Sequence, residues 1–175
     1  VTVQAGTGVT ITTNGSASVQ LSGSVTAINT LLAATNSVSY TPATHFNGSD
    51  ALSITVSDGG NTGSGGTKSG SASVALTVNP VNDAPVNTVP LTAQSTNEDS
   101  SKVISGLSIA DVDGGSGTFT VTLAVSNGSV SVLAGSGVTI DYNGTASVQL
   151  TGTRAAINTL LATASAVSYT PSLNY

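Results

Sequence analysis

Residues 79–113 read NPVNDAPVNTVPLTAQSTNEDSSKVISGLSIADVD, and this stretch decides how the chain is organised. Proline fixes φ and lacks a backbone N–H, so Pro80 and Pro85 predict an extended tether instead of a helix or a central strand. The stretch holds five of the chain's eight acidic residues: Asp83, Glu98, Asp99, Asp111 and Asp113. Ca²⁺ binds six to eight oxygens and accepts carboxylate, amide and carbonyl ligands together. The stretch therefore predicts a calcium-stiffened junction between two tandem β-domains.

The chain repeats itself on both sides of this stretch. Residues 1–46 align without a gap to residues 130–175, at an offset of 129 (130 − 1), and AINTLLA at 27–33 recurs at 156–162. We therefore expect residues 1–83 to be the C-terminal part of one repeat and residues 84–175 the N-terminal part of the next, within a longer array. The alternative is that incomplete domains of different chains complete each other head to tail.

The composition excludes several classes of protein. Only 6% of the residues are charged, and three cations stand against eight acids, which does not suit a nucleic-acid partner. The chain has no cysteine for disulfides, and no apolar run is long enough to insert in a membrane. The single histidine, His45, is replaced by Asn174 in the second copy. No catalytic set accompanies His45, so we expect that the protein is not an enzyme.

Short segments in which apolar and small polar residues alternate predict many strands. Two of the Asn-Gly pairs, at residues 14–15 and 143–144, are typical of hairpin turns. In the strands expected at 51–57 and 71–79, alternate apolar residues are expected to face a core. These residues are Leu52, Ile54, Val56, Val74, Leu76 and Val78. The other expected strands cover residues 1–4, 8–13, 17–22, 37–41, 102–110 and 117–126, and the first four recur from residue 130.

The apolar spacing changes once in each copy. Ala27, Ile28, Leu31 and Leu32 have the spacing of a short amphipathic helix, which Ser24 or Thr26 would cap. A second helix is expected near residues 155–162. The predicted fold class is therefore all-β: tandem immunoglobulin-like antiparallel β-sandwiches, each with one short helix inserted.

Several short motifs together resemble a known family. They are FNGSDAL at 46–52, VSDG at 56–59, VNPVNDAP at 78–85, ED at 98–99 and DVD at 111–113. The set is similar to the bacterial cadherin-like repeats, which belong with the VCBS-type and related tandem immunoglobulin-like domains of giant secreted adhesins and surface proteins. The resemblance covers nearly the whole chain, and its most specific part is VNDAP. It implies an extracellular, calcium-rigidified region without catalysis.

The resemblance also implies calcium ligands. Asn82 and Asp83 match the cadherin linker, Asp111 and Asp113 match the Asp-x-Asp of the following domain, and Glu98 matches an early glutamate that serves the far end of its own domain. Cadherins have more acids in the linker, so we expect one or two ions per junction here.

Two further residues complete the candidate set. Asp58 matches the acidic loop before the last strand, where cadherins have a glutamate, and Asp99 follows Glu98. The alternative interpretation is an ordinary turn, next to Pro85 for Asn82 and Asp83 and before Gly114 for Asp111 and Asp113. The candidate metal ligands are Asp58, Asn82, Asp83, Glu98, Asp99, Asp111 and Asp113.

Four Asn-Gly-Ser/Thr sequences are formal N-glycosylation acceptors. They begin at Asn14, Asn47, Asn127 and Asn143. The interpretation that we favour is that these Asn-Gly pairs serve turn geometry.

The expected function is mechanical: a calcium-stiffened stalk in a large extracellular bacterial protein, for cell adhesion or biofilm formation. Its partners would be the neighbouring repeats of the same chain. One alternative is a surface filament or layer that the repeats themselves form, by strand exchange or lateral packing with other copies. A carbohydrate-binding module is a further alternative, although the chain has no Trp and only four Tyr.

Overall fold

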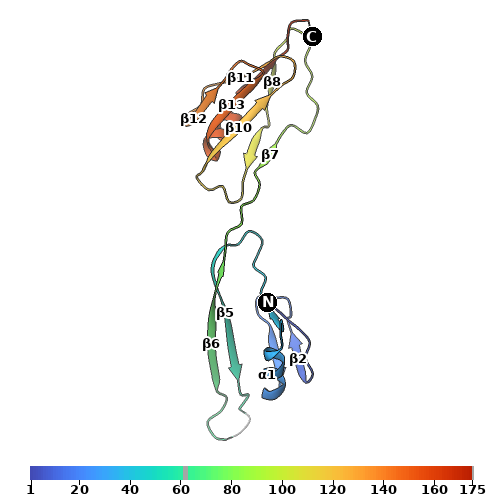
Figure 1. Cartoon of the computed structure of the whole chain (residues 1–175), viewed down its shortest axis with the longest axis vertical. Helices are drawn as coiled ribbons and strands as arrows, with labels where there is room; N and C mark the ends of the chain where they lie inside the picture. Colours follow the sequence, from blue (N-terminus) through green and yellow to red (C-terminus); the bar gives the residue numbers. More distant parts are fainter. Residues whose placement is uncertain (61–62, 175) are drawn as a thin grey trace. The chain divides into compact units, whose positions relative to one another are not determined.

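The chain forms two compact units of antiparallel strands (Figure 1). A computed structural model describes residues 1–60 and 63–174. The units are Val1–Pro80 and Val81–Tyr175; the sequence placed the division after residue 83. Small antiparallel sheets and two short helices make up the described residues, which confirms the all-β class.

The second unit contains two three-stranded antiparallel sheets and one strand pair. In the first sheet, the order is β10 (Thr118–Ala124), β13 (Ser147–Thr153) and β12 (Val138–Asp141). In the second sheet, the order is β11 (Ser129–Val132), β14 (Val167–Thr170) and β8 (Lys102–Ile104). Strand β7 (Val86–Thr88) pairs with β9 (Ser108–Ala110).

A single hydrophobic core joins these elements of the second unit. Val148, Leu150 and Ile157 are fully buried at its centre, on β13 and on helix α2 (Arg154–Ala162). Strand β10 adds Phe119 and Val121, which are partly buried against the core. Alternate residues of the strand that was expected at 117–126 therefore face the core.

Both predicted helices are present, and each begins at a side-chain cap. Ser24 Oγ accepts a 3.2 Å hydrogen bond from the Ala27 N–H at the start of α1 (Val25–Ala33). Thr153 Oγ1 accepts the matching bond from Ala156 before α2. Of the two predicted caps for the first helix, Ser24 is therefore the one used. Neither helix in the described part of the chain has the length and apolar character needed to cross a membrane.

The first unit repeats part of the second unit, but residues that are buried in the second unit are partly exposed at the aligned positions of the first. Strand β1 (Thr2–Val3) pairs with β4 (Val38–Ser39), and β2 (Val9–Thr12) pairs with β3 (Gln20–Gly23). Leu21 and Ile28 are partly exposed, whereas their counterparts in the second unit, Leu150 and Ile157, are fully buried. The reason is that strands β8–β10, which help to enclose the core of the second unit, have no counterpart at the 129-residue offset among residues 1–80.

The remaining strands of the first unit form a long hairpin, and the prediction that its apolar residues face a core is wrong. Strand β5 (Gly48–Ser57) pairs along its whole length with β6 (Ser69–Val78). The exposed fractions of Ile54, Val56 and Val74 are 46%, 59% and 55%. Leu52, Leu76 and Val78, on the same face of the hairpin, are also partly exposed. The strands were predicted correctly, but the described part of the first unit does not bury this face.

Two local predictions were also wrong in detail. The turn between β2 and β3 places Thr13 and Gly15 at positive φ (55° and 81°), so Asn14-Gly15 is not a two-residue hairpin turn. The strand expected at 102–110 is interrupted at Gly106, whose φ is 78°, and becomes β8 and β9. Glycine adopts this conformation without steric penalty, which is why the chain bends there.

Candidate cation site at the start of the second unit

The loop after β9 is organised around the side chain of Asp111. Its Oδ1 accepts hydrogen bonds from the backbone N–H groups of Asp113 (3.1 Å) and Gly114 (2.7 Å). A Cβ atom at residue 114 would overlap the ring of Phe119. Glycine is therefore needed at 114 for this loop to close, and in the closed loop the Asp111 side chain lies against the backbone of Asp113 and Gly114.

Asp113 connects this loop to the linker. Its Oδ2 accepts a 2.9 Å hydrogen bond from the backbone N–H of Asp83, which lies 30 residues earlier in the chain. Asn82 donates from Nδ2 to the carbonyl oxygen of Asp83 (3.1 Å). The structure thus brings together four of the seven predicted ligands: Asn82, Asp83, Asp111 and Asp113.

One residue of this site was missed from the sequence. The guanidinium Nη1 of Arg154, the first residue of α2, donates a hydrogen bond to the backbone oxygen of Asp111. The aligned residue in the first copy is Val25. An arginine that replaces an apolar residue between two otherwise similar segments is the signal that could have pointed to it. Arg154 holds the acidic loop against the start of the helix.

Glu98 and Asp99 lie in a different part of the second unit. Asp99, at a positive φ of 57°, accepts a weak 3.4 Å hydrogen bond from the Asn174 N–H through Oδ1. Asp99 precedes β8 and Asp111 follows β9, so two strands separate these acids along the chain. The structure does not bring Glu98 and Asp99 to the Asp111 loop.

Asp58 closes the loop of the β5–β6 hairpin. Its Oδ1 accepts hydrogen bonds from the backbone N–H groups of Lys68 (2.9 Å) and Gly60 (2.8 Å). The hydrogen bond from Lys68, which has the larger effect, and the one from Gly60 hold the pKa of Asp58 below its usual value of 3.8. Strand β6 separates this loop from Asn79 and Pro80, which follow the other end of the strand. The structure therefore gives Asp58 a role in the hairpin loop.

The four formal glycosylation sites have different environments. Asn14 Oδ1 accepts from the Val3 N–H and its Nδ2 donates to the Val3 oxygen, both at 2.8 Å. Asn143 makes the same pair of 2.8 Å bonds to Val132. A glycan on either Nδ2 would disturb this pair of bonds. Asn47 makes a 3.5 Å contact to His45, and the backbone oxygen of Asn127 accepts from Tyr169 Oη.

The chemistry of the donors at the Asp111 loop fits a hard cation only in part. Within residues 1–60 and 63–174, no three acidic or histidine side chains gather closely enough to hold a metal ion. The carboxylates of Asp83, Asp111 and Asp113, with the Asn82 amide oxygen and nearby carbonyls, are nevertheless oxygen donors of the kind that Ca²⁺ prefers. Neighbouring carboxylates repel each other unless a cation lies between them.

Comparisons of the chain with protein-family models, with curated proteins and with solved structures found no match. No family is therefore assigned to the chain.

Proposed function

We propose that this chain is a repeat segment of a large extracellular bacterial surface protein, in which Ca²⁺ stiffens a stalk of immunoglobulin-like β-sandwiches. The observation that carries the proposal is the hydrogen bond from the Asp83 N–H to Asp113 Oδ2. This bond links the proline-bracketed linker to the acidic loop of the second unit. The 129-residue internal repeat supports a modular, mechanical role.

The stiffening follows from electrostatics. A cation bound to the Asp111 loop would neutralise the carboxylates that otherwise repel each other, and it would hold the linker at Asp83 to that loop. A linker fixed at one end has fewer orientations, so the array becomes less flexible. Extracellular calcium modules bind with Kd on the order of 10⁻⁴ to 10⁻³ M, and we expect that range here.

The test is a calcium titration of the whole chain. Isothermal titration calorimetry measures binding, and small-angle X-ray scattering measures the distribution of maximum dimensions. We expect saturable binding with a narrower distribution of maximum dimensions in Ca²⁺. The variant carrying Asp111→Asn and Asp113→Asn should lose both effects. The matched control is Asp141→Asn, which removes a carboxylate at the end of β12, and it should keep both.

Two results would count against the proposal. One is the absence of calcium binding at millimolar concentration. The other is binding that is unchanged in the double Asn variant, which would place the ion elsewhere in the chain.

A further inference from the structure

The four Asn-Gly pairs of the chain share one chemical reactivity. The backbone nitrogen of the glycine can attack the side-chain carbonyl carbon of the asparagine, because glycine has no side chain that hinders the approach. A C–N bond forms, ammonia leaves, and the two residues are joined in a cyclic imide. The attack requires an asparagine carboxamide that can turn toward the glycine and a glycine N–H that can lose its proton.

Two of the pairs are held by hydrogen bonds at both of these groups. The carboxamide of Asn143 is paired with the backbone of β11, and the Gly144 N–H donates to the Val130 oxygen at 2.9 Å. The aligned bonds hold Asn14-Gly15, where the bond from the glycine N–H measures 3.1 Å. Neither asparagine can turn onto its glycine unless these bonds open, so the fold protects both pairs.

A third pair, Asn47-Gly48, is constrained on the glycine side. Asn47 Nδ2 makes only a long 3.5 Å contact to the His45 oxygen. Gly48, however, is the first residue of β5 and pairs with Val78 of β6. Its backbone therefore belongs to a strand and not to a turn.

The pair Asn127-Gly128, in the turn between β10 and β11, is constrained on neither side. Asn127 is exposed, and its carboxamide has no hydrogen-bond partner within residues 1–60 and 63–174. The Gly128 N–H likewise has no backbone acceptor in the part of the chain that the structure describes. Both reacting groups are therefore free to meet.

Glycine at position 128 is required by the fold. Its φ of 125° lies in a region that residues with a side chain rarely adopt. A Cβ atom there would also overlap the backbone oxygen of Thr170 on β14. The turn therefore keeps, directly after Asn127, the residue that hinders the attack least.

We propose that Asn127 is a site of spontaneous deamidation. The Gly128 nitrogen gives its proton to a base in solution and bonds to Cγ of Asn127, and Nδ2 takes a proton from water and leaves as ammonia. A second water then opens the imide. Attack at Cγ gives aspartate, and attack at the backbone carbonyl carbon gives isoaspartate, in which the main chain runs through the former side chain.

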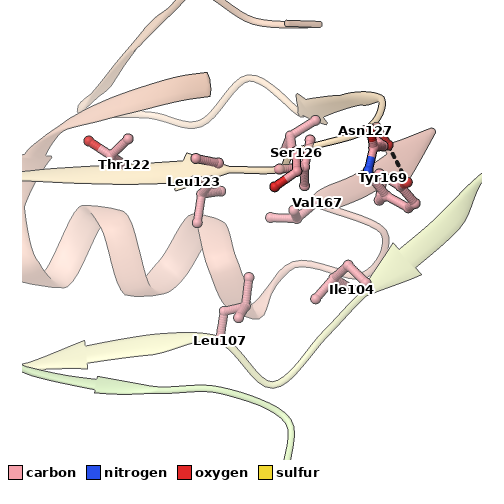
Figure 2. A pocket seen from close by; sticks show the side chains of 11 residues that line it. Ile104, Leu107, Thr122, Leu123, Ser126, Asn127, Val167 and Tyr169 are labelled. Carbon is pink, nitrogen blue, oxygen red and sulfur yellow. Dashed lines mark hydrogen bonds between the residues drawn. The ribbon is translucent and has the colours of Figure 1, made fainter. Parts of the chain in front are cut away.

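The hydroxyl of Tyr169 assists the first step. Tyr169 Oη donates a hydrogen bond to the backbone oxygen of Asn127 (Figure 2). This oxygen belongs to the same peptide group as the Gly128 N–H, so it shares the negative charge when the nitrogen loses its proton. A hydrogen-bond donor that already lies at an atom where charge develops stabilises the anion. Tyr169 therefore makes the Gly128 nitrogen easier to deprotonate.

The product differs from the original turn in two ways. Both aspartate and isoaspartate add a negative charge at an exposed position, and isoaspartate also lengthens the main chain between β10 and β11 by one carbon atom. The reaction needs no enzyme and no cofactor, so the modified fraction increases with the age of the protein. The inference does not rest on the calcium proposal.

Peptide mapping of the whole chain tests the site. The chain is incubated at mildly alkaline pH with a calcium chelator and is then digested with pepsin in acid, which stops the reaction. Mass spectrometry detects deamidation as a gain of about 1 Da and places it by fragmentation. We expect the reaction at Asn127 to be at least about tenfold faster than at Asn14 or Asn143.

Asn14 is the matched internal control, because Gly and Ser follow both Asn14 and Asn127. Equal rates at these two residues in the folded chain would overturn the proposal. In urea, which unfolds the chain, the two rates should become equal. A difference that persists in urea would show that the fold does not select Asn127, and would overturn the proposal as well.

The role of Tyr169 is tested with Tyr169→Phe, which removes only the hydroxyl. This variant should deamidate several-fold more slowly at Asn127, with an unchanged rate at Asn14. The matched control is Tyr40→Phe, the same change at the aligned position of the first unit, and it should leave the rate at Asn127 unchanged. Hydrogen exchange of β11 and β14 amides checks that the turn is intact. An unchanged or faster reaction at Asn127 in an intact Tyr169→Phe chain would overturn this role.

Discussion

At the scale of single residues, Asn158 and Asn29 show how one residue type acts differently in two similar segments. Asn158 on α2 accepts from the Ile109 N–H at 2.9 Å and donates to the Ile109 oxygen at 2.8 Å, so it pairs with β9 as another strand would. Asn29 occupies the aligned position on α1 and is exposed. The difference arises because α2 packs beside β9, whereas β9 has no aligned counterpart in the first unit.

We expect Asn158→Ala to lower the free energy of unfolding of the second unit by about 1–3 kcal/mol, because it leaves the buried backbone groups of Ile109 without these partners. Asn29→Ala is the matched control and should change stability by less than about 0.5 kcal/mol. Hydrogen exchange of β9 and β13 amides measures the change. Equal effects of the two substitutions would contradict this account.

The Tyr40–Asp50 hydrogen bond predicts a specific titration. The bond raises the pKa of Tyr40 above its usual 10.0, with burial and the charge of Asp50 acting in the same direction. The same bond lowers the pKa of Asp50 below 3.8, helped by the Ala51 N–H. The contact therefore persists from above the lowered Asp50 pKa up to the raised Tyr40 pKa. Asp50→Ala should lower the pKa of Tyr40 toward 10.0, as measured by ¹³Cζ chemical shifts of labelled tyrosine. A Tyr40 midpoint that is the same with and without Asp50 would show that the bond does not form in solution.

At the scale of elements, β13 and β3 have similar sequences but different degrees of burial. Leu150 on β13 is fully buried between β10, β12 and the core, whereas Leu21 on β3 is partly exposed. Leu150→Ala should reduce the stability of the second unit by about 2–5 kcal/mol, because it leaves a cavity. Leu21→Ala should have a clearly smaller effect on the first unit. Residue-resolved hydrogen exchange during urea titration compares the two, and a loss at Leu21 as large as that at Leu150 would mean that β3 is covered in solution.

The sequence predicted most elements because their signals are local. Both helices, the Ser24 cap and the alternation in β5, β6 and β10 follow from residue spacing within each segment. The break at Gly106 was not predicted, because the strand pattern continues on either side of it. Strand β7 was not expected either, since Val86–Thr88 follows a proline-rich stretch without clear alternation.

Burial was harder to predict than strand formation, since it depends on distant segments. The alternation in β5 and β6 identified which face is apolar, but spacing within two strands does not show whether other residues cover that face. The candidate site shows the same limit. Spacing along the chain suggested Asp111 with Asp113, but not that Asp83 and Arg154 would contact their loop, and it grouped Glu98 and Asp99 with a site from which the structure separates them.

At the scale of the whole molecule, the repeat order makes a prediction about stability. Residue 175 aligns with Phe46, and in the first copy the β5–β6 hairpin begins two residues after Phe46. A chain extended by a second copy of residues 47–80 after Tyr175 should have a second unit that unfolds at a higher urea concentration, because the apolar residues of the added hairpin can cover Ile104, Leu107 and Leu123 (Figure 2). Urea unfolding measures the change. The control extension carries Ser at the positions of Ile54, Val56 and Val74 in the added copy. Equal unfolding midpoints of the two extensions would show that the apolar residues of the hairpin do not cover the second unit.

The similarity between residues 1–46 and 130–175, which are identical at 28 of 46 aligned positions, also has a consequence for biosynthesis. Residues 81–129 enclose the later copy, and the earlier copy, which leaves the ribosome first, has a similar pattern of apolar residues. An earlier copy that is not yet enclosed by its own preceding strands could therefore pair with residues 81–129 before their proper partner is made. An array of such repeats avoids this kinetic trap when each copy is enclosed by its own preceding strands before the next set emerges, so the order of translation becomes part of how the fold is specified.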